Sequence, residues 1–303
     1  MIQLSRVTKK FGERLAVDDL TLTVPRGEIF GLLGHNGAGK STAIGMMLGQ
    51  VWPTSGELRV CGYEVTSQRN RALQNVGAIF ESPVFYDYLT GWRNLEILSS
   101  YTAPTSRERI REVVEWVGLT GREQSKVRTY SHGMRSRLAL AQALLPKPKL
   151  LILDEPSDGL DPEGIHEMRK TILRLHRELG LTILLSSHLL NEVEQLCTRI
   201  AVLQQGRKVF EGDVSEVRAA RGRVSLKTPD FAAATALLRE RGLITDAREG
   251  KFIVLTDGRS TAEVAQALVS AGMAVEGIWQ HEQTVEDFYL SLVKASPILA
   301  AAN

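Results

Sequence analysis

The segment from Gly31 to Ala43, GLLGHNGAGKSTA, contains several glycines directly ahead of Lys-Ser-Thr. Glycine inside regular structure costs roughly 0.5–1 kcal/mol relative to alanine, so a cluster of glycines needs a reason. The spacing from Gly34 to Ser41, Gly-x-x-x-x-Gly-Lys-Ser, is that of a phosphate-binding loop, in which backbone N–H groups turn inward toward phosphate oxygens. The segment therefore predicts a nucleotide site in which Lys40 reaches the β- and γ-phosphates and the Ser41 hydroxyl binds Mg²⁺.

A second group of chemically capable residues follows the apolar run LLIL, which leads into Asp154 and Glu155. A buried strand would deliver both carboxylates at its carboxyl end, the edge where α/β sheets bind ligands. We expect Asp154 to hold Mg²⁺, directly or through water, and Glu155 to orient or deprotonate the attacking water. Together with the glycine-rich loop, these residues predict hydrolysis of a nucleoside triphosphate.

The elements that must position these residues can be read from the hydrophobic pattern. Alternating residues near the N-terminus predict antiparallel strands, and continuous apolar runs at 28–34, 76–82, 149–156 and 181–188 predict buried parallel strands. Helical periodicity between 83 and 148 predicts a helical insertion in this α/β domain. We therefore expect a mainly parallel sheet, an antiparallel β subdomain and a helical subdomain within residues 1–217, and a small α+β domain over residues 218–303.

Composition excludes several classes of protein. The formal net charge of +2 gives no reason to expect nucleic-acid binding, and no run approaches the roughly 18 apolar residues of a membrane span. The start lacks the apolar core of a secretory signal. The only cysteines, Cys61 and Cys197, favour a reducing cytoplasm over a disulfide framework, and both are expected to be small buried residues.

Residues 1–215 resemble an ATP-binding-cassette (ABC) ATPase, because a signature-like segment precedes the carboxylate strand. The family's common form is Leu-Ser-Gly-Gly-Gln, and this chain has YSHGM over residues 130–134, with Ser131 and Gly133 matching. The resemblance implies a RecA-like P-loop NTPase core, an ATPase activity, and a signature motif that closes over ATP bound by a partner subunit. In physical terms, a Ser hydroxyl and N–H groups at the start of a helix suit an anion.

The resemblance also assigns roles to residues at other family positions. Asp161 matches the D-loop acid, His188 the switch histidine that touches the γ-phosphate, and Phe11 the aromatic that stacks on adenine. One departure is Glu81, which stands where the family has its Q-loop glutamine and is expected to bind Mg²⁺ or water. Catalysis is thus expected from Glu155, His188 and Lys40. The nucleotide would be bound by Phe11, Gly34, His35, Asn36, Gly37, Ala38, Gly39, Lys40, Ser41, Thr42, Ser131, Gly133 and Asp161, and Mg²⁺ by Ser41, Asp154 and Glu81.

Three motifs are similar to the bacitracin-resistance type of exporter ATPase: FESPVFYDYLT, Gly133-Met134 and the C-terminal TVEDFYLSL. This resemblance implies an ATP-hydrolysing subunit that drives export of a drug, peptide or lipid through separate membrane permease subunits, at the cytoplasmic face of the membrane. A homodimer of ATPase subunits is expected, and a heterodimer stays open. The alternatives are an importer ATPase and a soluble ABC ATPase acting in translation or DNA maintenance. The soluble class is disfavoured because its members usually carry tandem cassettes, long coiled coils or zinc ligands.

Overall fold

The computed structural model describes residues 1–80, 84–101, 105–219, 224–248, 250–256, 258–280 and 284–295. The chain divides into two compact units, Met1–Gly212 and Asp213–Asn303. We describe each unit by itself. The first contains every residue expected to bind nucleotide, so its sheets and helices determine the geometry of the candidate site.

The centre of the first unit is a six-stranded sheet with the order β10-β9-β3-β8-β7-β6. Neighbours from β9 to β6 are parallel, and the register pairs Leu33 of β3 with Ser187 of β8, and Asp154 of β7 with Ser186 of β8. β3, β7 and β8 are buried at every position, which is why their sequences are continuous apolar runs rather than alternating ones. The strands are β3 Ile29–Leu33, β6 Val76–Ile79, β7 Leu150–Asp154, β8 Thr182–Ser187, β9 Arg199–Gln204 and β10 Arg207–Asp213.

A second, antiparallel sheet with the order β2-β1-β4-β5 lies against α1 and the parallel sheet. Its strands show the alternating burial of a sheet that has one solvated face. Its elements are β1 Ile2–Phe11, β2 Arg14–Val24, β4 Ser55–Val60 and β5 Tyr63–Glu64, and the helices beside it are α1 Lys40–Met47 and α2 Val65–Leu73. One hydrophobic core joins Leu4 and Leu22 of this sheet to Met46 of α1 and Ile152 of β7.

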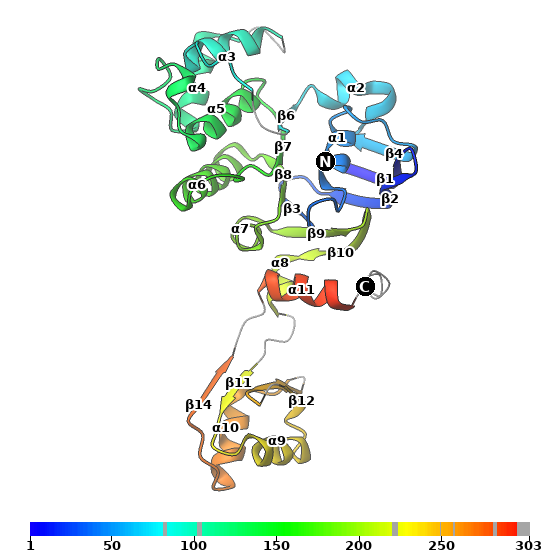
Figure 1. Cartoon of the computed structure of the whole chain (residues 1–303), viewed down its shortest axis with the longest axis vertical. Helices are drawn as coiled ribbons and strands as arrows, with labels where there is room; N and C mark the ends of the chain where they lie inside the picture. The colour runs from blue at the N-terminus through cyan, green and yellow to red at the C-terminus, as the bar shows by residue number, and fades with distance from the viewer. Residues whose placement is uncertain are drawn as a thin grey trace. The chain divides into compact units, whose positions relative to one another are not determined.

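The remaining helices of the first unit lie on the other side of the parallel sheet (Figure 1). They are α3 Gly91–Ser100, α4 Arg107–Trp116, the 3₁₀ turn η1 Val127–Thr129, α5 His132–Leu144, α6 Pro162–Leu179 and α7 Leu190–Leu196. Side-chain caps fix where several of them begin: Thr90, Ser106, Ser131 and Asp161 each accept a hydrogen bond from a backbone N–H three residues later.

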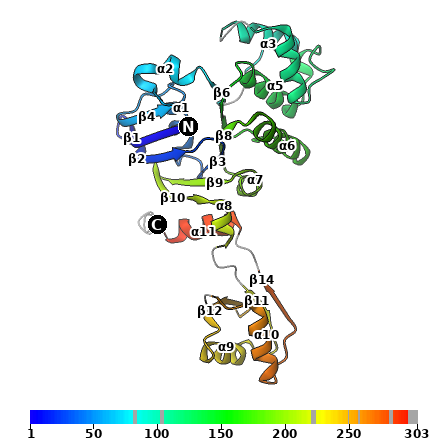
Figure 2. The same cartoon turned by 180° about the vertical axis from the view of Figure 1, so that it is seen from behind.

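The second unit contains a four-stranded antiparallel sheet with the order β12-β13-β11-β14 (Figure 2). Two helices, α9 and α10, alternate with these strands as β-α-β-β-α-β, and both contribute to a separate hydrophobic core around Leu226, Leu238 and Ile253. Two further helices, α8 and α11, contact each other. The elements are α8 Val214–Ala219, β11 Val224–Lys227, α9 Phe231–Glu240, β12 Ile244–Arg248, β13 Phe252–Leu255, α10 Thr261–Ser270, β14 Gly277–Gln280 and α11 Val285–Ala295.

The predicted fold class is confirmed: a mainly parallel core sheet stands beside an antiparallel sheet and a group of helices. The division between the two units comes after Gly212, a few residues before the expected boundary at 217, because α8 belongs to the second unit. In the described part of the chain, no helix combines the length and apolar composition needed to cross a membrane.

Candidate functional site

The glycine-rich loop connects β3 to α1 and depends on two glycines for its path. Gly34 has φ 156° and Gly39 has φ 105°, and a Cβ atom at either position would lie 2.6 Å from a backbone oxygen, that of Leu203 or of Ala16 respectively. Any other residue would therefore clash with main chain that cannot move aside. The loop is fixed at both ends, which leaves His35, Asn36 and Gly37 between them exposed.

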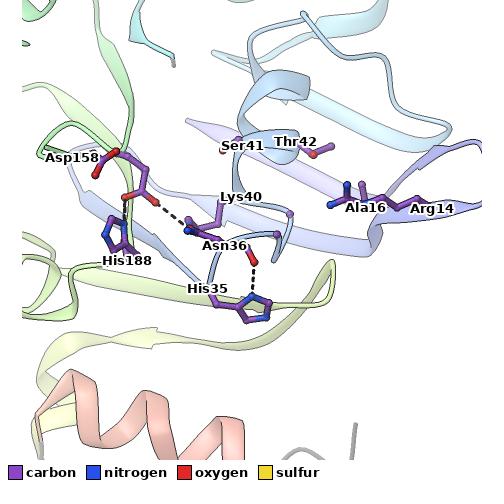
Figure 3. Close-up of a pocket in the computed structure, with 12 residues that line it drawn as sticks. Arg14, Ala16, His35, Asn36, Lys40, Ser41, Thr42, Asp158 and His188 are labelled. Atoms are coloured by element: carbon purple, nitrogen blue, oxygen red, sulfur yellow. Dashed lines mark hydrogen bonds and ion pairs between the residues drawn. The ribbon is translucent and has the colours of Figure 1, made fainter. Parts of the chain in front are cut away.

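Lys40 is the first residue of α1, and its side chain is only 5% exposed. Its ammonium group donates a hydrogen bond to the Gly34 carbonyl oxygen at 2.7 Å. It also forms an ion pair with Glu155 Oε1 at 3.2 Å, which a dashed line at Lys40 marks in Figure 3. A buried ammonium group without an anionic partner would be costly. Glu155 thus neutralises Lys40 within the protein itself.

The two carboxylates after β7 are positioned by one hydroxyl group on the neighbouring strand. Ser186 Oγ in β8 donates a hydrogen bond to Asp154 Oδ1. Ser186 Oγ also accepts a hydrogen bond from the Glu155 backbone N–H at 3.0 Å. Asp154 is buried, while Glu155 is partly exposed and has φ 47°, an uncommon backbone conformation for a residue with a side chain. The turn that begins at Glu155 therefore directs its carboxylate toward Lys40 and away from the buried end of the strand.

His188, directly after β8, completes a chain of polar contacts. Its Nδ1 lies 2.8 Å from Glu155 Oε2, and its backbone N–H donates to the same oxygen at 3.2 Å. One oxygen of Glu155 thus faces Lys40 and the other faces His188 (Figure 3). A carboxylate with both oxygens engaged in this way has a fixed orientation, as a general base or a water-positioning group requires.

These residues border a pocket of about 520 Å³. Its walls come from the glycine-rich loop, the start of α1, the ends of β7 and β8, and the β1–β2 hairpin. The lining residues are Arg14, Ala16, His35, Asn36, Gly37, Gly39, Lys40, Ser41, Thr42, Glu155, Asp158 and His188. The pocket combines N–H groups and a lysine for phosphates with a fixed carboxylate for water, an arrangement suited to hydrolysis of a phosphoanhydride.

Comparison with known proteins identifies the family. The family model described as ABC transporter matches residues 17–158. The bacitracin transport ATP-binding protein BcrA of Enterococcus faecalis is 36% identical over 296 residues, which cover 97% of this chain and 96% of that protein. The chain belongs to the ABC transporter ATP-binding proteins.

Two further matches support the ABC cassette. An uncharacterized ABC transporter ATP-binding protein of Bacillus subtilis, YhcH, is 47% identical over 218 residues, 72% of this chain and 70% of that protein. A solved dimeric structure of a bacterial ABC transporter cassette superposes with a TM-score of 0.64 at 25% identity, covering 71% of this chain and 99% of that one. The predicted resemblance is confirmed, and the chain is an ATP-hydrolysing cassette of this family.

The residues expected to form the signature and the D-loop line a different pocket, of about 590 Å³. Ser131 and Gly133 lie there with Asp161, and His132 joins the two segments because its Nε2 lies 3.1 Å from the Asp158 carbonyl oxygen. None of these three predicted residues borders the pocket that contains Lys40. The structure therefore separates the expected nucleotide residues into two groups.

Four predicted residues remain: Phe11, Gly34, Ala38 and Glu81. Phe11 is 49% exposed beneath the Lys9 ammonium group and does not line the pocket, whereas Arg14, its partner in the β1–β2 hairpin, does. Gly34 and Ala38 are buried within the loop and support it. Glu81 lies outside the described residues, so its predicted role as a metal ligand stays a prediction.

Sequence reasoning missed Arg14, Ala16, Asp158 and Ser186. Arg14 and Ala16 reach the pocket only because the hairpin folds over the glycine-rich loop, where the Gly206 N–H also donates to the Ala38 carbonyl oxygen. No short motif contains that information. Ser186 could have been suspected, because the segment LLSSH places hydroxyl groups on an otherwise apolar strand.

A buried carboxyl group lies behind the site. Glu192 in α7 is 6% exposed, and its Oε1 has no hydrogen-bond partner. Burial raises the pKa of Glu192 and outweighs the opposing effects of a hydrogen bond with Ser157 and of the charges on Arg169 and His188. The negative charge of Glu155 adds a smaller rise.

The described residues contain no group of three or more His, Cys, Asp or Glu side chains suited to holding a metal. The oxygen donors that line or support the pocket, Ser41 and Asp154, are nevertheless of the type that Mg²⁺ prefers. Such a pair fits an ion that takes most of its ligands from nucleotide and water.

The replacement Glu155→Gln tests the role of the carboxylate. We expect this variant to retain ATP binding, because the Glu155 carboxylate no longer competes with ATP for Lys40. We expect hydrolysis to slow at least about 100-fold, because an amide cannot accept the proton of water. Phosphate release and binding of a fluorescent ATP analogue measure the two effects. Lys40→Ala is the matched variant and should instead weaken ATP binding. Hydrolysis by Glu155→Gln at nearly the wild-type rate would contradict the assignment.

The replacement Glu192→Gln tests the buried carboxyl. Folding raises the pKa of Glu192. Its favourable contribution to the free energy of unfolding is therefore complete below the unfolded-state pKa, and is lost as pH rises through the folded-state pKa. Glu192→Gln should therefore raise the melting temperature at pH 7, and the gain should vanish near about pH 4. The exposed Glu115→Gln is the control and should change stability little at either pH. An equal gain for Glu192→Gln at both pH values would show that ionisation is not its cause.

Proposed function

We propose that this chain is the ATPase subunit of an exporter that moves a drug, peptide or lipid through a separate membrane permease. The observation that carries the proposal is the similarity to a bacitracin transport ATP-binding protein along 97% of this chain. That similarity includes the C-terminal unit and is not limited to the cassette. By this proposal, the subunit works at the cytoplasmic face of the membrane and is held there by its permease.

The proposed chemistry at the first pocket follows from its geometry. ATP phosphates take the place of Glu155 beside Lys40, and backbone N–H groups of the glycine-rich loop bind the phosphate oxygens. Bound through Ser41 and Asp154, Mg²⁺ would offset the negative charge of the phosphates. Glu155 then orients or deprotonates the water, while His188 fixes the carboxylate and faces the terminal phosphate.

The proposed working form is a dimer in which each ATP contacts two subunits. Support comes from the separation of Ser131, Gly133 and Asp161 from the pocket that contains Lys40. Ser131 caps α5, so its hydroxyl group and the free N–H groups of that helix start together form a surface suited to an anion. Two copies of the chain, or one copy and a similar subunit, would bring this surface onto the partner's nucleotide.

Transport assays with a permease test the exporter proposal. The chain is co-expressed with a candidate permease, and the complex is isolated in detergent and placed in proteoliposomes with the cassette facing outward. ATP added outside should then drive a labelled peptide antibiotic or lipid into the vesicle lumen, which is the direction of export. The Glu155→Gln complex is the control and should not transport. ATP-driven movement out of the lumen would indicate an importer, and failure to bind any permease would favour a soluble ATPase.

The replacement Ser131→Arg tests the two-subunit site. In the Glu155→Gln background, we expect ATP to drive dimerisation, and Ser131→Arg to prevent it while leaving ATP binding by the isolated subunit intact. The reason is that each charge-assisted contact with phosphate is worth about 1.5–3 kcal/mol and a bulky side chain blocks several of them. Light scattering with and without ATP measures the dimer. Gln124→Arg, an exposed change outside both pockets, is the control. Equal dimerisation of all variants would contradict a signature contact across the interface.

A further inference from the structure

The cassette has a third pocket, at the edge of the parallel sheet opposite the ATP pocket. Lys149 and Asn75 directly precede β7 and β6, and Arg26 lies in the turn that leads into β3. These positions are at the amino ends of the strands, whereas Lys40 and Glu155 follow the carboxyl ends of β3 and β7. The pocket has a volume of about 530 Å³, and its lining residues are Met1, Gln3, Arg26, Arg59, Cys61, Gly62, Tyr63, Gln74, Asn75 and Lys149.

The lining of this basic pocket is cationic. It includes Arg26, Arg59 and Lys149 and contains no aspartate or glutamate. Arg59 has two acidic neighbours: Glu57 Oε2 lies 4.0 Å from its guanidinium group, and Glu64 is its pairing partner across β4 and β5.

Neither acid cancels the charge of the pocket. The Glu57 contact is at the outer limit of an ion pair and is exposed to solvent, so it is worth little. The oxygens of Glu64 accept hydrogen bonds from Thr66 and Ser67. The basic pocket is therefore lined by three cationic side chains from three chain segments, and acidic neighbours neutralise their positive charge at most in part.

The backbone beneath these cations is firmly held. The Asn75 carbonyl oxygen accepts hydrogen bonds from the N–H groups of both Lys149, at 2.8 Å, and Leu150, at 3.2 Å. The Cys61 N–H donates to the Met1 carbonyl oxygen at 2.9 Å, which ties the β4–β5 turn to the start of β1. A ligand would meet a frame that is already formed, so that only the ends of the basic side chains must become ordered on binding.

We propose that the basic pocket binds a small ligand of the diphosphate class. Guanidinium groups match the geometry of phosphate oxygens with paired N–H donors, and the lysine adds a point charge. Gln3, Gln74 and Asn75 also line the pocket, and side-chain amides of this kind can donate N–H hydrogen bonds to phosphate oxygens. The volume falls within the range of small-molecule sites and exceeds what a single phosphate needs.

Cys61 provides a local reporter of occupancy. Cys61 lines the pocket and is half-buried. Burial raises the pKa of its thiol, and the positive charges of the Met1 ammonium group and of Lys149 oppose this rise in part. The other cysteine, Cys197, is buried between α7 and β9, and burial strongly raises the pKa of its thiol. An aromatic disulfide reagent should therefore modify Cys61 first, and a ligand in the basic pocket should slow that reaction.

The test uses the full chain with inorganic pyrophosphate as the probe. We expect pyrophosphate to slow modification of Cys61 saturably. Arg26→Gln and Lys149→Gln should each raise the half-saturating concentration about tenfold, because each removes one charge-assisted contact. Lys170→Gln, an exposed change on α6, should have no effect. Lys40→Ala should also leave the protection unchanged, which separates this pocket from the ATP pocket.

Three results would overturn the proposal. One is protection by sodium chloride at matched ionic strength that equals protection by pyrophosphate, because screening alone would then be the cause. Another is protection that persists unchanged in Arg26→Gln and Lys149→Gln, or is lost in Lys40→Ala. The last is calorimetry that detects no pyrophosphate binding to Lys40→Ala. If Cys61 does not react, calorimetry measures pyrophosphate binding to the same variants directly. Circular dichroism verifies that each variant is folded.

Discussion

The ion pair between Lys40 and Glu155 is the contact on which the geometry of the ATP pocket depends. Lys40 follows β3, Glu155 follows β7, and β8 lies between these two strands in the sheet. Parallel register brings the carboxyl ends of all three strands to one edge. Because the ammonium group is buried, it requires an anion whether or not nucleotide is bound. In the proposed mechanism, the phosphates of ATP therefore replace the Glu155 carboxylate beside Lys40. The carboxylate released in this way is the one proposed to act on water.

Further acidic residues lie near Lys40 and Glu155. Asp154 and Asp158 lie at or near the pocket, and Glu192 lies buried behind it. Burial disfavours the charged form of Glu192, which limits how much negative charge faces the phosphates. ATP and the carboxylates repel each other unless cations lie between them. Lys40 reduces this repulsion, and a bound Mg²⁺ would reduce it further. Lys40 alone cannot neutralise both ATP and Glu155, because the two anions compete for one ammonium group.

The sequence predicted the parallel strands, the glycine-rich loop and the carboxylate pair, since each follows from local pattern and chemistry. Continuous apolar runs reveal strands buried on both faces, and the spacing of Gly34, Gly39 and Lys40 reveals a loop around phosphate. Ser186 and Arg14 belong to the site through tertiary pairing that no single segment records. Local rules thus recover the residues that carry the chemistry better than the residues that position them.

The two groups of nucleotide residues also bear on how ATP energy is used. Lys40 and Ser131 line separate pockets, so under the proposed two-subunit scheme one cassette alone encloses ATP incompletely. Ser131 and Asp161 are both helix caps, and the N–H groups around them are already oriented before a partner arrives. In the proposed dimer, contacts between this surface and the γ-phosphate would form only on assembly and would be lost once that phosphate leaves. An interaction that differs between two states shifts their populations. Under the proposed scheme, ATP hydrolysis assisted by Glu155 would therefore change the stability of the dimer as well as the chemistry of the nucleotide.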